Sequence, residues 1–541
     1  MAAYFGVTPL APAYVLLSGA VLVLLLGPSI TPGYRYALRV AVCAASLLAL
    51  VLVDITAMSG GSRDPQTYTL IHWADAPALA LRSAPFHPFR WGLFLSLLAI
   101  ATATRASSTR FLLTGQTMIL VLATAAFGVL SAGSYRTLAV AIVLFDSVAA
   151  LGWSLHRQPH RAIGHLVLAG VTGTAVMTMA SGLDSDLFAA AGQRVDLLFS
   201  VAVWLRVGLY PLFEAGNPIV MARPTRQAWQ VINLIVGLYL VSLGITPEVI
   251  WPALIVALLH GALAWIETRR EQAFAHAAWA LAGTVLASAA LSVNGLAVIA
   301  ASVATFAGWL VLTLASSPAP HSRDRGPTPD WQRLWAYGPL TMATLSWLGL
   351  PFTVGWFGRA SLMQLIWDTR GPQMLALAAV TCGAAVSVMY RLWQMWVQSR
   401  AVRLTPERLG GATVATSPFL VPVVGLWFVS LAGRDAFDPL AVGGYGVGAW
   451  AGLGGVLLWA AFLGYGRDWL ALLDPSFRKI VLRRLRLDWL MQCAEWLGEP
   501  ACRMLLRLRS IGEGEHYLAW ALLTAICIGL LLAFNGMVRG S

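Results

Sequence analysis

Lysine is almost absent from this chain of 541 residues, and Lys479 is the only one. Charged residues of all kinds make up 11% of the sequence, whereas 58% of the residues are hydrophobic. Soluble domains have a much larger share of charged residues, because their surfaces face water. The composition therefore excludes an ordinary soluble protein and predicts an all-α polytopic membrane protein.

The sequence also lacks the motifs of enzymes and of metal or cofactor sites. The five cysteines have the spacing neither of a disulfide framework nor of a metal site: Cys43, Cys382, Cys493, Cys502 and Cys527. No nucleotide or flavin motif is present, so we expect no cofactor and no catalytic site within the chain. The net charge of +12 comes from arginines in short loops between apolar runs, which is typical of membrane proteins. Nucleic acid is therefore not an expected partner.

Long apolar runs recur along the chain, and a helix that crosses a membrane needs about 20 such residues. No basic segment precedes the first run, so we expect a retained span and not a cleaved signal peptide. The rule predicts about 14 to 16 transmembrane helices. They lie at roughly 11–30, 36–58, 89–105, 111–131, 137–155, 163–181, 196–212, 227–246, 249–267, 273–290, 295–316, 335–367, 372–396, 418–433, 444–464 and 516–537.

Arginines are concentrated in alternate connections between these spans. Arg157 and Arg161 share one connection and Arg223 and Arg226 another, whereas Arg136 stands alone in its loop. Because positive residues favour the cytoplasmic side, the arginine-rich connections are predicted to be cytoplasmic and both termini to lie outside. We expect a multi-pass protein of a bacterial inner membrane.

Two stretches differ from the apolar spans. Residues 59–88 mix Gly, Pro and alternating apolar residues, which favours an external hairpin or a re-entrant loop. Residues 466–512 interleave arginines with Leu, Trp and Met, which predicts a basic amphipathic helix on the cytoplasmic membrane surface. Such a helix either anchors the chain to anionic lipid or contacts a neighbouring subunit.

Two predicted spans contain one ionisable residue each, near the middle of the membrane. These residues are Asp146 in 137–155 and Arg206 in 196–212. A bare charge in hydrocarbon costs roughly 2.5–3.5 kcal/mol, so such residues usually face a partner or a water-filled path. We expect Asp146 to pair with Arg206, either within an ion path or as a buried pair that only fixes helix packing.

Prolines interrupt two of the long apolar segments. Pro211 interrupts the first, while Pro351 and Gly355 interrupt the second, just before Arg359. Equivalent helix breaks in two halves of a membrane protein indicate an internal repeat, and such breaks border the ion or substrate path in transporters. Glu214, after the first break, is a candidate for the cytoplasmic entrance of such a path.

Five segments follow one another with a particular spacing across roughly residues 70–400: RFLLTGQTMILVLATAAFGVLSAGSYRTLAVAIVLFDSVAALGW, VAVWLRVGLYPLF, NLIVGLYLVSLG, ALLHGALAWIETRREQAFAHAAWALAGTVLASAAL and LSWLGLPFTVGWFGRASLMQL. In this order the chain resembles the antiporter-like membrane subunits of respiratory complex I. Related subunits occur in multisubunit sodium/proton antiporters, membrane-bound hydrogenases and an inorganic-carbon accumulation system. The basic 466–512 segment resembles a shortened lateral helix of the largest of these complex I subunits.

This resemblance implies roles for several charged positions. The family has a glutamate on helix 5 paired with a lysine on helix 7, a lysine on helix 8, and a lysine or glutamate on broken helix 12. Asp146 takes the acid position, Arg206 the helix 7 position and Arg359 the helix 12 position. The helix 8 lysine is missing, because that position falls on Ile235.

The same mapping places His260 and His276 near the central axis of the protein. They either replace part of the role of the missing lysine or are packed polar residues. Burial can make a lysine alternate between charged and neutral forms, whereas arginine stays charged. We therefore expect a relay through Asp146, the two histidines and water, with arginines as fixed charges, or else reduced or absent ion translocation. An alternative for Arg359 is that it snorkels to the membrane interface.

The resemblance implies two inverted five-helix repeats in which helices 7 and 12 are broken. The predicted organisation is N-terminal helices and an external loop at 1–110, repeats at 111–246 and 247–397, C-terminal helices at 398–465, the basic surface helix at 466–512 and a last span at 513–541.

The first functional hypothesis is a subunit that translocates protons or sodium ions within a larger energy-coupling complex. Its expected partners are other membrane or cytosolic subunits, in a complex I-like assembly or in an inorganic-carbon uptake system with a cytosolic zinc protein resembling carbonic anhydrase. The alternative is a non-pumping membrane anchor that docks a soluble enzyme.

Overall fold

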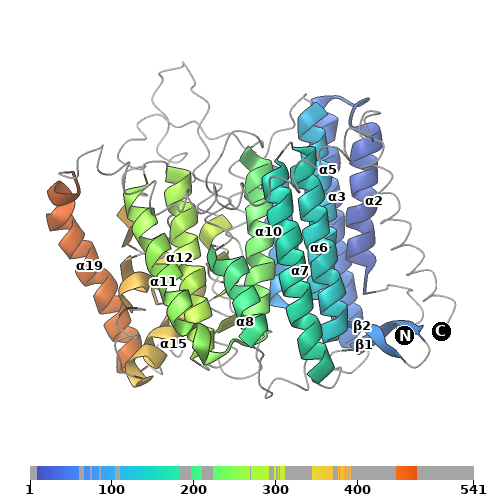
Figure 1. Ribbon diagram of the computed structural model, residues 1–541. Helices are drawn as coiled ribbons and strands as arrows, with labels where there is room; N and C mark the ends of the chain where they lie inside the picture. The colour runs from blue at the N-terminus through green and yellow to red at the C-terminus, as the bar shows by residue number, and fades with distance from the viewer. Residues whose placement is uncertain are drawn as a thin grey trace, which may run out of the picture.

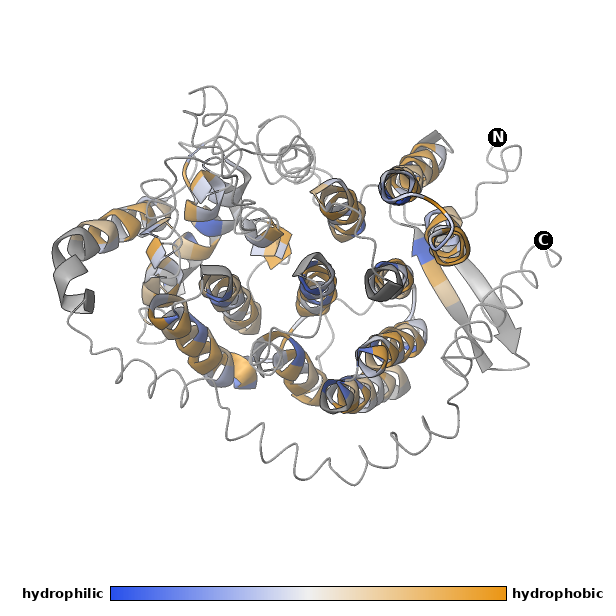
Figure 2. Cartoon of the chain, turned by 90° about the horizontal axis from the view of Figure 1, so that it is seen from above, coloured by the Kyte–Doolittle hydropathy of each residue, from blue (hydrophilic) through white to orange (hydrophobic). Residues whose placement is uncertain are grey.

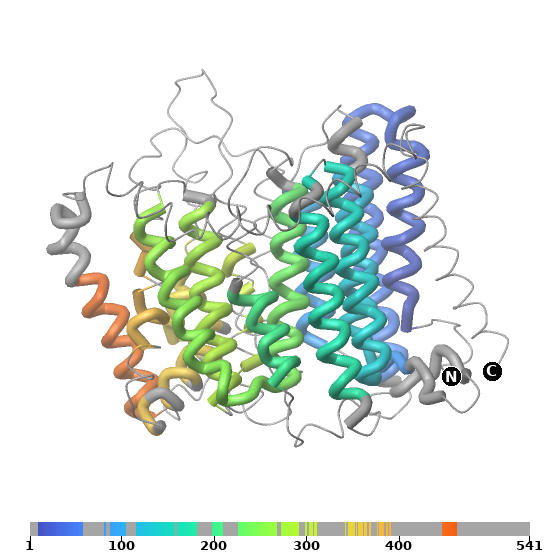
Figure 3. The backbone as a smooth tube through the Cα atoms, in the orientation of Figure 1, coloured from blue at the N-terminus to red at the C-terminus, as the bar shows by residue number. Residues whose placement is uncertain are grey.

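The computed structural model describes residues 9–59, 66–73, 76–83, 87–103, 110–156, 158–182, 197–209, 223–267, 270–291 and 446–471, with short stretches between 298 and 390. Its helices stand side by side, from α2 and α3 at one end of the bundle to α15 and α19 at the other (Figure 1). The tube in Figure 3 shows the same order along the bundle.

The N-terminal end of the bundle consists of α2 (Ala11–Leu26), α3 (Pro32–Ser59) and α4 (Pro88–Ala103). Prolines begin α3 and α4, where a proline has the right φ angle and its missing N–H costs no helical hydrogen bond. Helix α2 packs against α3 and α5, and α3 packs against α4.

A β-hairpin connects α3 to α4, as predicted for the 59–88 stretch. Strands β1 (Gln66–Trp73) and β2 (Ala76–Ser83) pair in antiparallel fashion. The hairpin is fixed to the turn between α5 and α6, because Gly133 N–H donates to Ala80 O at 2.8 Å and Arg82 N–H donates to Ser131 O at 2.8 Å.

The middle of the bundle contains the elements that carry Asp146 and Arg206. They are α5 (Arg110–Leu130), α6 (Tyr135–Leu155), α7 (Pro159–Gly182), α8 (Leu197–Trp204), the π-helix η1 (Leu205–Leu209) and α10 (Arg223–Ser242). Each coincides with one of the predicted spans between 111 and 246. Helix α6 begins at an N-cap, where Ser134 Oγ accepts from Thr137 N–H at 3.2 Å.

The far end of the bundle contains the short 3-10 helix η2 (Pro247–Val249), α11 (Ile250–Ile266), α12 (Arg270–Ala290), α15 (Val354–Thr369) and α19 (Val447–Ala471). Helix α11 packs along α12, and α15 packs along α19. Most of the predicted basic surface helix, residues 472–512, and the whole predicted last span at 513–541 lie outside the described residues.

The helices bury a large apolar core and also leave large apolar side chains exposed. Figure 2 shows hydrophobic residues along the helices of the bundle. Val167, Ile255 and Leu458 are each more than half exposed. Such side chains suit a lipid environment and not water. Within the described residues, five helices are long and apolar enough to cross a membrane: Pro32–Ala57, Tyr135–Leu155, Arg161–Ala180, Pro247–Ile266 and Gln272–Ala290. The helical membrane fold is confirmed; the helix count and the repeats remain predictions.

Candidate functional site

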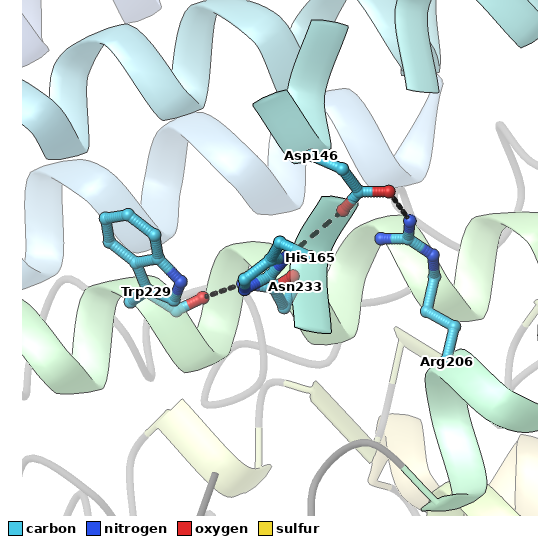
Figure 4. Close-up of polar contacts among 5 residues, drawn as sticks. All are labelled: Asp146, His165, Arg206, Trp229 and Asn233. Atoms are coloured by element: carbon cyan, nitrogen blue, oxygen red, sulfur yellow. Dashed lines mark hydrogen bonds and ion pairs between the residues drawn. The ribbon is translucent and has the colours of Figure 1, made fainter. Parts of the chain in front are cut away.

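The predicted pairing of Asp146 with Arg206 is confirmed. The guanidinium of Arg206 donates from Nη2 to Asp146 Oδ2, and the two side chains are 2% and 0% exposed (Figure 4). The guanidinium also lies 5.7 Å from the centroid of the Phe145 ring. Because the two charges cancel, this pair can persist in an apolar bundle where either ion alone would be costly.

His165 is a third member of this site, and the sequence reasoning missed it. Its Nδ1 lies 3.3 Å from Asp146 Oδ1, and the residue is fully buried. Since the carboxylate accepts, the imidazole is protonated at Nδ1. The carboxylate of Asp146 therefore has a fixed cation on one oxygen and a titratable ring on the other (Figure 4). Asn233 and Trp229 lie beside this group, and Asn233 Nδ2 donates to Trp229 O at 3.0 Å.

Arg206 lies in the π-helical turn η1, not in regular α-helix. Single π-helical turns are frequent at functional sites, because they disturb the regular backbone hydrogen bonds. Gly208 O in this turn lies 3.2 Å from His260 Nε2 on α11. The same five-residue turn therefore contacts the acid–base pair through its arginine and a histidine through its backbone.

His260 and His276 form a second buried polar pair, between α11 and α12. Their Nδ1 atoms are 3.0 Å apart, and they are 0% and 1% exposed. A carbonyl only accepts, so His260 must be protonated at Nε2. If His260 is neutral, its Nδ1 accepts from His276; if it carries an extra proton, its Nδ1 donates to His276. The pair can thus hold and pass one extra proton.

Arg359 is the third candidate cation, on the second turn of α15. Its Nη1 donates to Trp347 O at 2.7 Å and its Nη2 donates to Thr381 O. The predicted interruption is present: the chain leaves helical geometry at Gly349, whose φ is +70°, and α15 begins at Val354. These inward hydrogen bonds argue against the snorkelling interpretation.

The remaining predicted positions are less informative. Pro351 lies in the break, and Gly355 lies in the first turn of α15. Ile235 is fully buried in the apolar core. Pro211 and Glu214 lie outside the described residues.

Another buried polar group lies near the hairpin, and the sequence reasoning did not single it out. Trp91 Nε1 donates to Asp54 Oδ2 at 2.7 Å, and Asp54 is fully buried. His87 precedes α4 close to Arg82 and Arg90; burial and these guanidiniums lower its pKa to about 3. Across the part of the chain that the structure describes, no group of three or more His, Cys, Asp or Glu side chains could hold a metal ion.

The fold and these buried charges define a helical membrane protein with ionisable groups inside its bundle. The chain shares this fold with a chain of the membrane-bound sulfane sulfur reductase (MBS), an archaeal respiratory membrane complex. The TM-score is 0.64 at 15% sequence identity, over 97% of this chain and 99% of that one.

A chain of the Mrp complex from Dietzia sp. DQ12-45-1b is similar, with a TM-score of 0.66 at 14% identity over 98% of this chain. The match spans 62% of the length of that Mrp chain. No family model and no curated protein matches the sequence. Both structural neighbours are chains of larger complexes, and the fold agrees with the resemblance to antiporter-like subunits.

Proposed function

We propose that this chain is a cation-translocating, proton-conducting subunit of a larger membrane complex. The observation that supports this most strongly is the series of buried polar contacts around the π-helical turn. One group joins His165, Asp146 and Arg206, and the other joins Gly208 O, His260 and His276. Ionisable residues inside a membrane bundle are expensive and usually mark ion paths.

In this proposal the two arginines are fixed charges and the histidines and Asp146 handle the proton. Arginine keeps its proton at any physiological pH, so Arg206 is a fixed cation beside Asp146. A proton on His165 can pass to Asp146 Oδ1 along their hydrogen bond. Water must then bridge from the Asp146 group to His260, and the His260–His276 contact passes the proton onward.

The alternative is a non-pumping anchor that docks a soluble enzyme. The direct ion pair between Asp146 and Arg206 gives this alternative its support, since a satisfied buried pair can serve helix packing alone. Co-purification of the native complex identifies the partners, which we expect to be respiratory-type subunits or a cytosolic zinc protein of an inorganic-carbon system.

Proton flux into vesicles that contain the purified complex tests the proposal. We expect Asp146→Asn to abolish most flux while the complex stays assembled, because the amide cannot carry a proton between His165 and the water path. The matched control is Asp54→Asn, which alters a buried aspartate away from this site. Equal flux from the native complex and Asp146→Asn would overturn the conduction hypothesis and favour the anchor.

A further inference from the structure

A small cavity adjoins Arg359 and the break before α15. Its volume is about 30 Å³, enough for about two water-sized groups. Arg359, residues of α12 and residues of the first turns of α15 line it. Four hydroxyl-bearing residues also line it, namely Thr284, Thr305, Ser346 and Thr381. The lining is thus largely apolar, with one arginine and a few hydroxyl-bearing residues set in it.

The charge of Arg359 has no carboxylate close by in the sequence. No Asp or Glu occurs between Glu271 and Asp324 or between Asp330 and Asp368. The segments that line the cavity therefore contain acids only at their ends, and Asp368 is hydrogen-bonded to Gln364 one turn away. Arg359 donates to two backbone carbonyls, which are dipoles and not full negative charges.

Among the residues that the structure describes, one nitrogen of Arg359 has no hydrogen-bond partner. This atom is Nε, and it is buried. An arginine cannot relieve this situation by losing its proton. A guanidinium with an open donor beside a hydroxyl-lined cavity needs an acceptor, and a net positive charge favours an acceptor that is an anion.

The helix break adds to this preference. The cavity includes Gly355 and Gly358 from the first turns of α15, a helix of 16 residues. The N-terminal end of a helix has a partial positive charge, and half-helices in transporters direct this end at anionic groups. The charge of Arg359 and the partial charge of the helix end are both positive, so both favour an anion in the cavity.

We propose that this cavity binds one small monovalent inorganic anion, such as a halide or a planar oxyanion of similar size. The anion would accept from Arg359 Nε and from the hydroxyl of Ser346, whose oxygen accepts from Gly355 N–H, and it would balance the charge of Arg359. Cavity size and the single unbalanced charge both disfavour sulfate and phosphate dianions. This inference does not depend on proton conduction, because binding requires no ion flux.

Equilibrium binding of radiolabelled chloride to the full-length chain in nanodiscs tests the site. The medium contains gluconate as the bulk anion at constant ionic strength. We expect one saturable site per chain, competition by nitrate or bicarbonate, and much weaker competition by sulfate. Arg359→Gln is expected to weaken binding by about tenfold or more, because the charge and the open donor are lost together.

A second variant keeps the test valid if Arg359→Gln fails to fold. Ser346→Ala removes one lining hydroxyl and is expected to weaken chloride binding several-fold. Ser134→Ala is its control, because both hydroxyl oxygens accept from an N–H at a helix start and Ser134 is not part of the cavity. No saturable binding by the native chain, or native-like binding by both folded cavity variants, would overturn the proposal. Proton flux measured on the same preparations reports on conduction separately.

Discussion

Two arginines inside the bundle, Arg206 and Arg359, satisfy their charged side chains in different ways. Arg206 pairs with Asp146 and leaves no net charge, whereas Arg359 donates, within the described part of the chain, to the backbone carbonyls of Trp347 and Thr381. Both lie where a helix departs from regular geometry, in a π-helical turn and after a break respectively. The Asp146–Arg206 pair therefore carries no net charge, and the second region keeps a positive charge beside a cavity.

This difference suggests that the first region handles a proton and the second region binds a counterion. In the first, the carboxylate accepts from both an arginine and a histidine, so an extra proton on this group can be shared between the imidazole and the carboxylate. In the second, the fixed charge attracts a counterion, and that ion can leave or be replaced. The variants below test whether pairing really distinguishes the two arginines.

The largest effect is expected when Arg206 is replaced by methionine. Removal of one partner from a buried ion pair costs about 3–5 kcal/mol, because Asp146 keeps an uncompensated charge. Arg359→Met removes a cation that contacts no carboxylate among the described residues, so the expected cost is that of carbonyls that lose a donor, about 1–3 kcal/mol. Unfolding free energies in mixed detergent micelles measure both.

The double variant Asp146→Asn/Arg206→Met is the control for this comparison. It removes both charges but keeps an oxygen that accepts from His165 Nδ1. Most of the stability lost in Arg206→Met should return, since no unpaired ion is left. Equal losses for Arg206→Met and Arg359→Met would show that pairing does not distinguish the two regions.

Much of the first region was predictable from the sequence, and the reason is energetic. An acid and a base inside apolar runs need partners, so the sequence alone predicts that Asp146 pairs with Arg206. The hairpin between α3 and α4 followed equally from its Gly, Pro and alternating residues. These features follow from which residue types occur where along the chain, and this can be read from the sequence.

The rest of the site depends on packing that the sequence does not display. His165 was missed because a neutral imidazole costs little in a span and therefore does not demand a partner. The π-helical turn at Arg206 follows from a small change in backbone hydrogen bonds, which has no compositional mark. The cavity at Arg359 exists only because segments far apart in the chain leave a gap between them.

A smaller effect is expected from a methyl group added at the helix break. In Gly355→Ala the new Cβ would lie 1.6 Å from Ser346 O, and a backbone carbonyl cannot rotate away. The expected loss is about 3 kcal/mol, the upper range for overpacking. Gly237→Ala, next to Arg206, meets Val207 Cγ2 at 2.8 Å, a side-chain atom that can move, so its loss should be about 1 kcal/mol.

Gly170→Ala completes that series, because no atom lies within 4 Å of its added Cβ. Alanine favours helix over glycine by about 1 kcal/mol, so this variant should be at least as stable as the native chain. Thermal unfolding of the three variants under one condition gives the ranking. If Gly355→Ala were as mild as Gly237→Ala, the break in the second region would be looser than the structure indicates.

The smallest effect is expected when a serine that caps a helix start is removed. The two regions differ in where this serine lies. Helix α6 is capped by its own Ser134, whose Oγ accepts from Thr137 N–H at 3.2 Å. Helix α15 is capped from across the break, where Ser346 Oγ accepts from Gly355 N–H at 3.0 Å. Loss of such a cap costs typically about 1 kcal/mol, so Ser134→Ala and Ser346→Ala should destabilise the protein by similar amounts.

Their effects on anion binding should differ although their stabilities match. Ser346 lines the cavity and fixes the first turn of α15, so Ser346→Ala should also weaken chloride binding to the nanodisc-embedded chain. Ser134 lies at the hairpin end of α6, where its loss leaves the cavity intact, and binding should stay native. A parallel loss of binding in both variants would mean that chloride responds to general stability and not to the geometry around Arg359.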